Sequence, residues 1–285
     1  MTINEIVSPG FIPPVLKKKK FAFNNFLIWV CVVIIIFSSC EKVVNIDLNN
    51  SAKKYIIQGI VNNQGICQVK ISQTVNFSDA NNFHAISGAT VTVKDNNGVP
   101  VLLNETSAGL YETNLISGAP THTYNLTVNI SGQQFTATSQ MPAQVGFDSL
   151  YISELSLFGS TTKFATVAFR DPPLVKNAYH FIQYKNSLAN KGIFALNDDF
   201  SDGKAINSQL NDFNGNDDKI NNGDTIKVEM QCIDANVYLF WTSLAESSTG
   251  NSQMASPGNP VSNINGGALG FFSAHTSQNK TVIAR

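Results

Sequence analysis

The feature that most constrains the fold is a two-residue alternation of apolar and polar residues, repeated in short segments separated by turn residues. Successive side chains of a strand point to opposite faces, so the alternation predicts strands with one buried face. The connecting residues are rich in Asn and Gly, which tolerate the backbone of tight hairpins. We therefore expect an antiparallel β-sandwich of immunoglobulin or prealbumin type over residues 55–142. Its predicted strands are 55–61, 67–75, 89–94, 99–103, 124–130 and 134–139.

A second mainly β, sandwich-like domain is expected over residues 143–285. Asp234 is placed to cap a short helix, because apolar residues follow it at helical spacing. Two long stretches, 197–224 and 247–267, are rich in Asn, Asp, Ser, Gly and Pro, and loops of this length in a compact domain tend to be functional or disordered. The other predicted strands of this domain are 149–157, 162–170, 179–186, 225–233 and a closing strand at 268–274.

The N-terminal residues predict an exported and lipid-anchored chain. Four lysines at positions 17–20 precede a 12-residue apolar run, 26–37, which is shorter than the roughly 20 residues of a spanning helix. The run ends at Ser38-Ser39-Cys40, which resembles a bacterial lipobox. We interpret residues 1–39 as a lipoprotein signal peptide, Cys40 as the site of lipid attachment and residues 40–54 as a tether. A plain secretory signal and a short uncleaved anchor are the alternatives.

The charge of the mature chain excludes one class of partner. Processing would remove four of the 19 Lys and Arg residues and one of the 20 Asp and Glu residues, which leaves 15 against 19, a net charge of about −4. Binders of nucleic acid carry strongly basic faces, so we expect no nucleic-acid partner. Acyl chains on one cysteine would hold such a chain stably at a bilayer. The expected location is the outer membrane, on its periplasmic face or at the cell surface.

The sequence offers no strong catalytic or cofactor motif. Cys67 and Cys232 share strand faces with apolar residues and are expected to be buried thiols; a disulfide between them is the alternative. No zinc site is expected, because two cysteines without a set of His or Asp partners do not make one. The histidines are scattered, and no phosphate-binding motif is present. Two Ser-x-x-Lys matches, at residues 51–54 and 160–163, are interpreted as chance, because the Ser-Asp-Asn and Lys-Thr-Gly motifs that accompany them in penicillin-recognising enzymes are missing. We therefore predict a protein that is not an enzyme and holds no cofactor.

Two weaker ligand signals each have a simpler interpretation. Oxygen side chains alternate in a loop that could bind Ca²⁺, but the loop lacks the EF-hand Gly and Glu at their positions, so a solvated turn is favoured. Its candidate ligands are Asp212, Asn214, Asn216 and Asp218. Aromatic residues in or beside the long loops could stack on a carbohydrate, although core packing is favoured for each one singly. These aromatic residues are Phe200, Phe213, Phe271 and Phe272.

The order of short motifs resembles one family over nearly the full mature length. These proteins are outer-membrane lipoproteins typical of Bacteroidota, catalogued as a domain of unknown function and commonly encoded beside TonB-dependent receptors. The motifs that carry the resemblance are Cys40-Glu41, Tyr55-Ile56-Ile57-Gln58-Gly59, Asp148-Ser149-Leu150, Phe169-Arg170-Asp171-Pro172, Phe200-Ser201-Asp202-Gly203, Gly223-Asp224-Thr225-Ile226, Asn259-Pro260 and the block from Ser262 to Phe272. The resemblance implies a location and a neighbour, and it supplies no catalytic residues.

Together these features lead us to expect a non-enzymatic accessory of a TonB-dependent nutrient-uptake receptor. It would bind the substrate, such as a carbohydrate or a peptide, or the receptor itself. The contacts are expected from the loops 197–224 and 247–267, because binding residues concentrate on loops carried by rigid sandwiches. A structural or adhesive immunoglobulin-like surface module is the alternative function.

Overall fold

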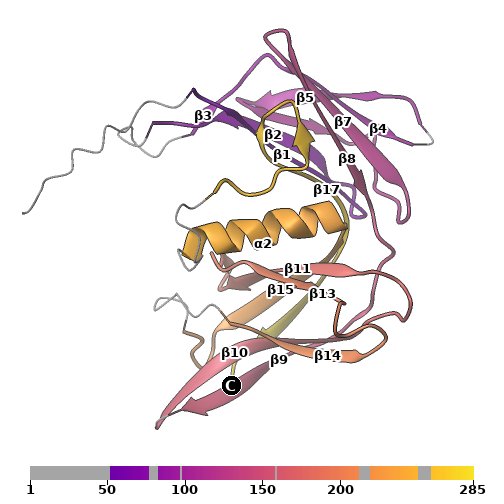
Figure 1. Ribbon diagram of the computed structural model, residues 1–285. Coiled ribbons are helices and arrows are strands. Elements are labelled where there is room, and N and C mark those ends of the chain that lie inside the picture. Colours follow the sequence, from indigo (N-terminus) through magenta and orange to yellow (C-terminus); the bar gives the residue numbers. More distant parts are fainter. Residues whose placement is uncertain (1–51, 77–82, 97, 158, 212–218, 250–257) are drawn as a thin grey trace, which may run out of the picture. The chain divides into compact units, whose positions relative to one another are not determined.

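The chain is built mainly from β-strands, as the sequence predicts (Figure 1). The computed structural model describes residues 52–76, 83–96, 98–157, 159–211, 219–249 and 258–285. The elements of the first half are β1 (Tyr55–Asn62), β2 (Cys67–Gln73), β3 (His84–Ala85), β4 (Thr90–Asp95), β5 (Val101–Ser107), β6 (Leu110–Thr113), β7 (Thr123–Ile130) and β8 (Gln133–Gln140). Those of the second half are β9 (Phe147–Leu157), β10 (Ser160–Arg170), β11 (Ala178–Lys185), β12 (Leu188–Ala189), β13 (Phe194–Asn197), β14 (Ala205–Leu210), β15 (Thr225–Ile233), α2 (Ala235–Thr249), β16 (Ile264–Asn265) and β17 (Leu269–Ile283).

The first half folds into a β-sandwich. One layer contains β1, β2, β3 and β6, and the other contains β4, β7, β8 and β16. Strand β5 joins the layers, because its residues 101–103 pair with β4 and its later residues pair with β6. The buried face of each strand carries the apolar residues of the alternation, so the two layers enclose a continuous core that includes Ile57, Val69, Val91 and Leu126.

The second half places two sheets and a helix around a second core. Strands β11, β12, β13 and β15 form one sheet with part of β17, and β9, β10 and β14 form the other. Phe169 of β10 and Tyr179 of β11 meet between these sheets with ring centroids 4.7 Å apart. The predicted helix is confirmed as α2, which covers the other face of the first sheet (Figure 1). There Phe240 of α2 lies 4.8 Å, centroid to centroid, from Phe271 of β17.

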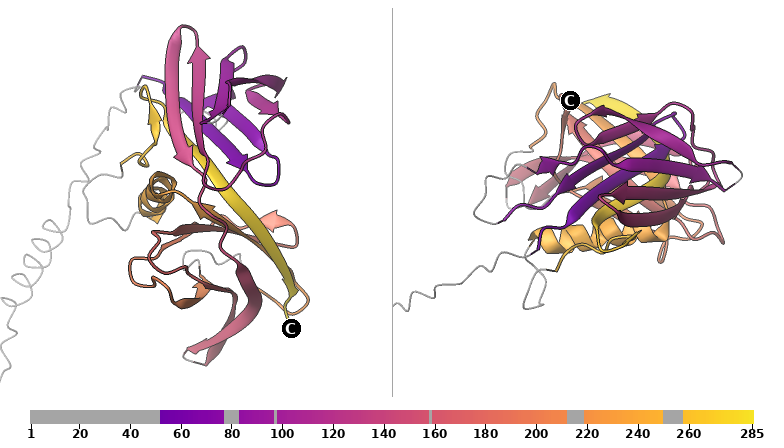
Figure 2. Two further views of the ribbon diagram at one scale, coloured as in Figure 1. Left: turned by 90° about the vertical axis from the view of Figure 1, so that its right-hand side faces the viewer. Right: turned by 90° about the horizontal axis from the view of Figure 1, so that it is seen from above.

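Strand β17 belongs to both halves of the molecule. It pairs in parallel with β1, from Ile56 opposite Leu269 onward, and antiparallel with β15 as far as Ile283. Figure 2 shows this long strand running from one sandwich to the other. Gly270 permits the close pairing with β1, because it has a φ of 102° and a Cβ there would collide with the carbonyl oxygen of Ile57. The strand is therefore longer than the predicted 268–274, and the division of the chain at residues 142 and 143 stays a prediction.

The structure tests one further expectation from the sequence, that Cys67 and Cys232 are buried thiols. Cys67 and Cys232 are both buried and free, which confirms the thiol interpretation. Burial raises the pKa of Cys67 to about 12 and also raises the pKa of Cys232, so both side chains stay protonated and unreactive near neutral pH. Within the described parts of the chain, no helix has both the length and the apolar character needed to cross a membrane.

Candidate functional site

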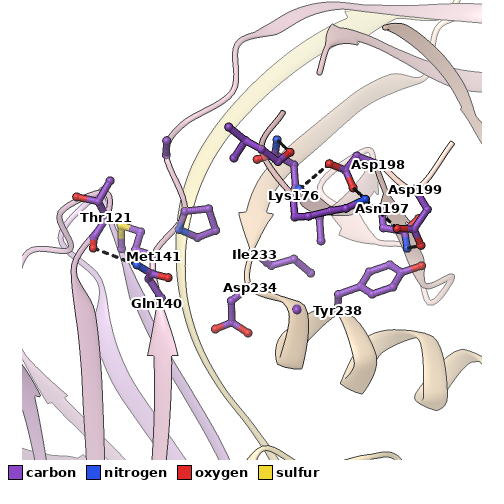
Figure 3. Close-up of a pocket in the computed structure, with 16 residues that line it drawn as sticks. Thr121, Gln140, Met141, Lys176, Asn197, Asp198, Asp199, Ile233, Asp234 and Tyr238 are labelled. Atoms are coloured by element: carbon purple, nitrogen blue, oxygen red, sulfur yellow. Dashed lines mark hydrogen bonds and ion pairs between the residues drawn. The ribbon is translucent and has the colours of Figure 1, made fainter. Parts of the chain in front are cut away.

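A cavity of about 560 Å³ lies where five segments of the chain converge (Figure 3). One wall comes from the first sandwich and the residues that follow it, and the others come from the start of β11, the end of β13 and the start of α2. This volume lies within the range of small-ligand pockets. The lining residues are Thr121, Gln140, Met141, Pro142, Ala143, Val175, Lys176, Asn177, Ala178, Asn197, Asp198, Asp199, Ile233, Asp234, Ala235 and Tyr238.

Asp234 fixes the helix end of this cavity. Its Oδ1 accepts the backbone N–H groups of Asn236 (2.9 Å) and Val237 (3.0 Å), which confirms the predicted N-cap. Its Oδ2 accepts a hydrogen bond from the Ser139 hydroxyl of β8. The Ser139 oxygen in turn accepts the N–H of Ala274 in β17 (2.8 Å). The first turn of α2 is thereby tied to the first sandwich and to the shared strand, so this wall is held by regular structure.

The opposite wall contains a cation between two carboxylates. Lys176 Nζ lies 3.4 Å from Asp198 Oδ1 and 3.2 Å from Asp199 Oδ1, and these hydrogen bonds raise the pKa of Lys176. Asp198 is buried, and its second oxygen accepts the N–H of Asn177 (2.9 Å). Tyr238 of α2 faces this group across the cavity (Figure 3). Burial and the charge of Asp199 raise the pKa of Tyr238, so its hydroxyl remains a neutral hydrogen-bonding group.

Three carboxylates gather behind this wall. One oxygen from each of Asp171, Asp198 and Asp202 lies within 4.8 Å of the others, a donor set of the kind that hard cations accept. Each carboxylate already has a protein partner. Asp171 accepts the Tyr179 hydroxyl and the N–H of Gly203 (3.1 Å), and Asp202 accepts the N–H of Leu174 (2.8 Å). The cluster therefore cross-links residues 171–177 to residues 198–204.

A buried polar network lies under α2. His180 stacks on Trp241 of the helix, with ring centroids 4.1 Å apart, and its Nδ1 lies 3.0 Å from Gln231 Oε1. Gln231 and Ser277 donate to Oε1 of Glu229 at 2.9 and 2.7 Å. On β17, His275 Nδ1 lies 2.9 Å from the Ser273 hydroxyl oxygen. Burial lowers the pKa of both His180 and His275 to about 4, so both imidazoles are neutral at neutral pH.

The candidate aromatic residues from the sequence analysis differ in burial. Phe271 and Phe272 are buried, which confirms core packing for these two. The same expectation is wrong for Phe200, whose side chain is 92% exposed, because the turn that carries it is tied back by hydrogen bonds through its neighbours. Phe213 lies outside the described residues.

The other sequence candidates receive no structural test. Cys40 lies outside the described residues, as do the calcium candidates Asp212, Asn214, Asn216 and Asp218. Of the two long loops, 197–224 supplies lining residues at its start, and no described residue of 247–267 lines the cavity. Sequence reasoning missed Lys176, Asn177 and Tyr238. Asp171 and Asp202 each lie in a motif that carried the family resemblance, but the spacing of some 30 residues gave no sign that they meet.

Comparison with protein-family models gives a match over most of the chain. A family model described as Domain of unknown function (DUF4249) matches residues 41–281. No curated protein matches the chain. The matched range includes every described segment that lines the cavity, so the cavity is made entirely from the matched region.

Proposed function

The chain belongs to the family described as Domain of unknown function (DUF4249), and we propose that it is an outer-membrane lipoprotein that assists a TonB-dependent nutrient-uptake receptor. In this proposal Cys40 carries the lipid, and the β-rich body is a binding module without catalytic activity. The lysine block, the short apolar run and the lipobox-like Ser38-Ser39-Cys40 support the anchor. The body would bind either the transported substrate or the receptor itself.

The cavity beside α2 is the observation that carries the binding role. Its walls belong to both sandwiches and to a capped helix, so a ligand would meet side chains that are already positioned. Apolar residues such as Ile233 and Met141 share the lining with amides and carboxylates, as in sites that combine burial with a few orienting polar groups. The serine–histidine pair Ser273 and His275 is buried on β17 and does not line the cavity, which is why we propose binding rather than catalysis.

The anchor and the partner can be tested in one experiment on the full chain. Cells producing the protein with a C-terminal epitope would be labelled with radioactive palmitate, and native membranes would then be cross-linked, solubilised and captured through the epitope. We expect label in the protein and a TonB-dependent receptor among the captured proteins. A Cys40→Ala variant should lose the label and leave the membrane fraction.

Cys31→Ala is the matched control, because Cys31 lies inside the predicted signal peptide and should not affect labelling. Membrane association of Cys40→Ala equal to that of the unaltered protein would contradict the lipid anchor. Capture without any TonB-dependent receptor from membranes that retain the labelled protein would contradict the accessory role.

A further inference from the structure

Two large apolar side chains stand almost fully in solvent on neighbouring loops. Leu174 is 94% exposed and Phe200 is 92% exposed, more than any other large hydrophobic residue in the described ranges. Single exposed apolar residues are ordinary on protein surfaces. These two lie on the loops 171–177 and 198–204, which the hydrogen bond from Leu174 N–H to Asp202 joins directly. We call these two segments the loop pair.

The loop pair holds one residue, Leu174, in a strained backbone conformation. Leu174 has a φ of 64°, in the left-handed region that a branched, bulky side chain rarely adopts. Its backbone N–H is fixed by Asp202, and the N–H of Gly203 is fixed by Asp171 (3.1 Å). Such strain persists only where the surroundings over-determine it, and it concentrates at binding sites. The apolar side chains are thus presented on a rigid frame, so little ordering entropy would be lost on binding.

The loop pair also forms the edge of an acidic cavity. Val175 follows Leu174 and Asp199 precedes Phe200, and both Val175 and Asp199 line the cavity. The lining carries three carboxylates, those of Asp198, Asp199 and Asp234, against the one ammonium of Lys176. Asp171 and Asp202 add two more negative charges close to Asp198, and the nearby cations Arg170 and Lys204 bond to backbone carbonyls of the loop pair. A positively charged ligand is therefore favoured over an anionic one.

We propose that the loop pair and the cavity form a docking site for an extended peptide segment in which a Lys or Arg is flanked by apolar residues. The cationic side chain enters between Asp199 and Tyr238, and the apolar side chains cover Leu174 and Phe200. A membrane surface fits less well, because anionic headgroups would meet the same carboxylates. This inference rests on the proposed binding function and deepens it by giving the chemistry of what is bound.

The test is a binding measurement on the purified full chain with synthetic peptides. The probe is a fluorescein-labelled Ala-Leu-Phe-Lys-Leu-Phe-Ala peptide, read by fluorescence anisotropy. A peptide with Glu in place of Lys and a peptide with Ser in place of every Leu and Phe are the chemical controls. We expect each control peptide to bind at least about tenfold more weakly, the effect of losing one well-placed contact.

Variants of the protein locate the binding. Phe200→Ser and Leu174→Asn should each weaken binding of the Lys peptide about tenfold, and Asn tolerates the left-handed backbone at position 174. Asp199→Asn should weaken the binding of the Lys peptide, whereas the binding of the Glu peptide should be unchanged or stronger. Leu188→Asn on β12 and Asp148→Asn on β9 are matched controls, since both residues are exposed and lie outside the loop pair and the cavity.

The outcomes separate this inference from the proposed function. Equal binding of the Lys and Glu peptides, undiminished binding by Phe200→Ser and Leu174→Asn, or no binding of any peptide would each overturn the docking site. If a receptor is still captured from native membranes in those cases, the accessory role stands. Selective peptide binding by a protein that incorporates no palmitate and captures no receptor would instead uphold the site and refute the accessory role.

Discussion

The two halves of the molecule bury different chemistry. Among the described residues, three buried polar side chains lie before residue 143, and eleven lie after it. The first sandwich encloses an almost wholly apolar core, with Tyr111 and Tyr124 directing their hydroxyls to backbone groups at its edge. The second half combines an apolar core with buried histidines, carboxylates and amides.

Under the proposed binding function, this difference separates a supporting domain from the region that would bind the ligand. Burying polar groups costs free energy unless each one finds a partner, so a domain that needed only stability would avoid them. In the second half two groups of buried polar residues, one under α2 and one in the loop pair, adjoin the elements that line the cavity. The first sandwich contributes a wall and a firm support.

The largest effect on both halves is expected from removing β17, the strand that they share. A chain that ends at Ala268 lacks β17, and with it the partner of β1 and Phe272 of the first core. We expect both halves to lose cooperative unfolding, because each core is left open on one side. Thermal unfolding followed by circular dichroism measures this. A chain ending at Ile283 is the control and should unfold cooperatively; a cooperative transition of the Ala268 chain would show that the first sandwich is self-sufficient.

The second largest effect is expected from low pH, which should destabilise the second half through its buried histidines. His180 and His275 have folded-state pKa values of about 4, below the unfolded value of about 6.5, so the unfolded chain takes up protons first as the pH falls. The part of the free energy of unfolding that depends on these two histidines is therefore fully present above about pH 6.5, and it declines between about pH 6.5 and 4. Each histidine should contribute a loss of up to about 3 kcal/mol, at 1.36 kcal/mol for each unit of pKa.

Urea unfolding at a series of pH values measures this decline. The charge of Glu229 opposes the lowered pKa of both histidines, but the effect of burial is larger. His180→Gln and His275→Gln should each flatten the decline, whereas His84→Gln, on exposed β3, should leave it as it is. If all three variants showed the same pH dependence of the free energy of unfolding, the buried histidines would not be the cause of the acid sensitivity of the second half.

The smallest effect concerns the helix that lies between the two halves. Asp234→Ala removes the cap of α2 and the acceptor for Ser139, and we expect a loss of about 1 kcal/mol, as for other N-caps. Asp234→Asn should retain most of the stability, because Asn caps helices almost as well. The free energy of unfolding in urea gives both values. An equal loss in the two variants would mean that the charge of Asp234, rather than its capping geometry, stabilises this junction.

Local patterns in the sequence predicted much of the fold. Alternation located β1, β7 and β15 closely, since the apolar face of each strand is buried; in β15 both faces are buried from Met230 onward. Asp234 predicted the start of the helix correctly, because N-capping is a local interaction between residues close in the sequence. The same reasoning missed β14, which lies inside the stretch 197–224 that was expected to be loop and is stabilised by pairing with β10.

The candidate site was less accessible to sequence reasoning. Its parts come from positions as far apart as Thr121 and Tyr238, and only the folded chain brings them together. Phe200 is a large apolar residue of the type that usually lies in a core, yet it is exposed, because the hydrogen-bonded turn around Asp198 places it at the surface. The pairing of β1 with β17 is likewise non-local, and no spacing within either segment indicates it.

The sharing of β17 has a consequence for how the protein is made. β1 emerges from the ribosome early, yet its neighbour Leu269 follows only after more than two hundred further residues. The first sandwich therefore stays open at one edge throughout most of synthesis, and a late-arriving strand closes both halves together. Such an order delays complete folding of the nascent polypeptide until its last strand has been made.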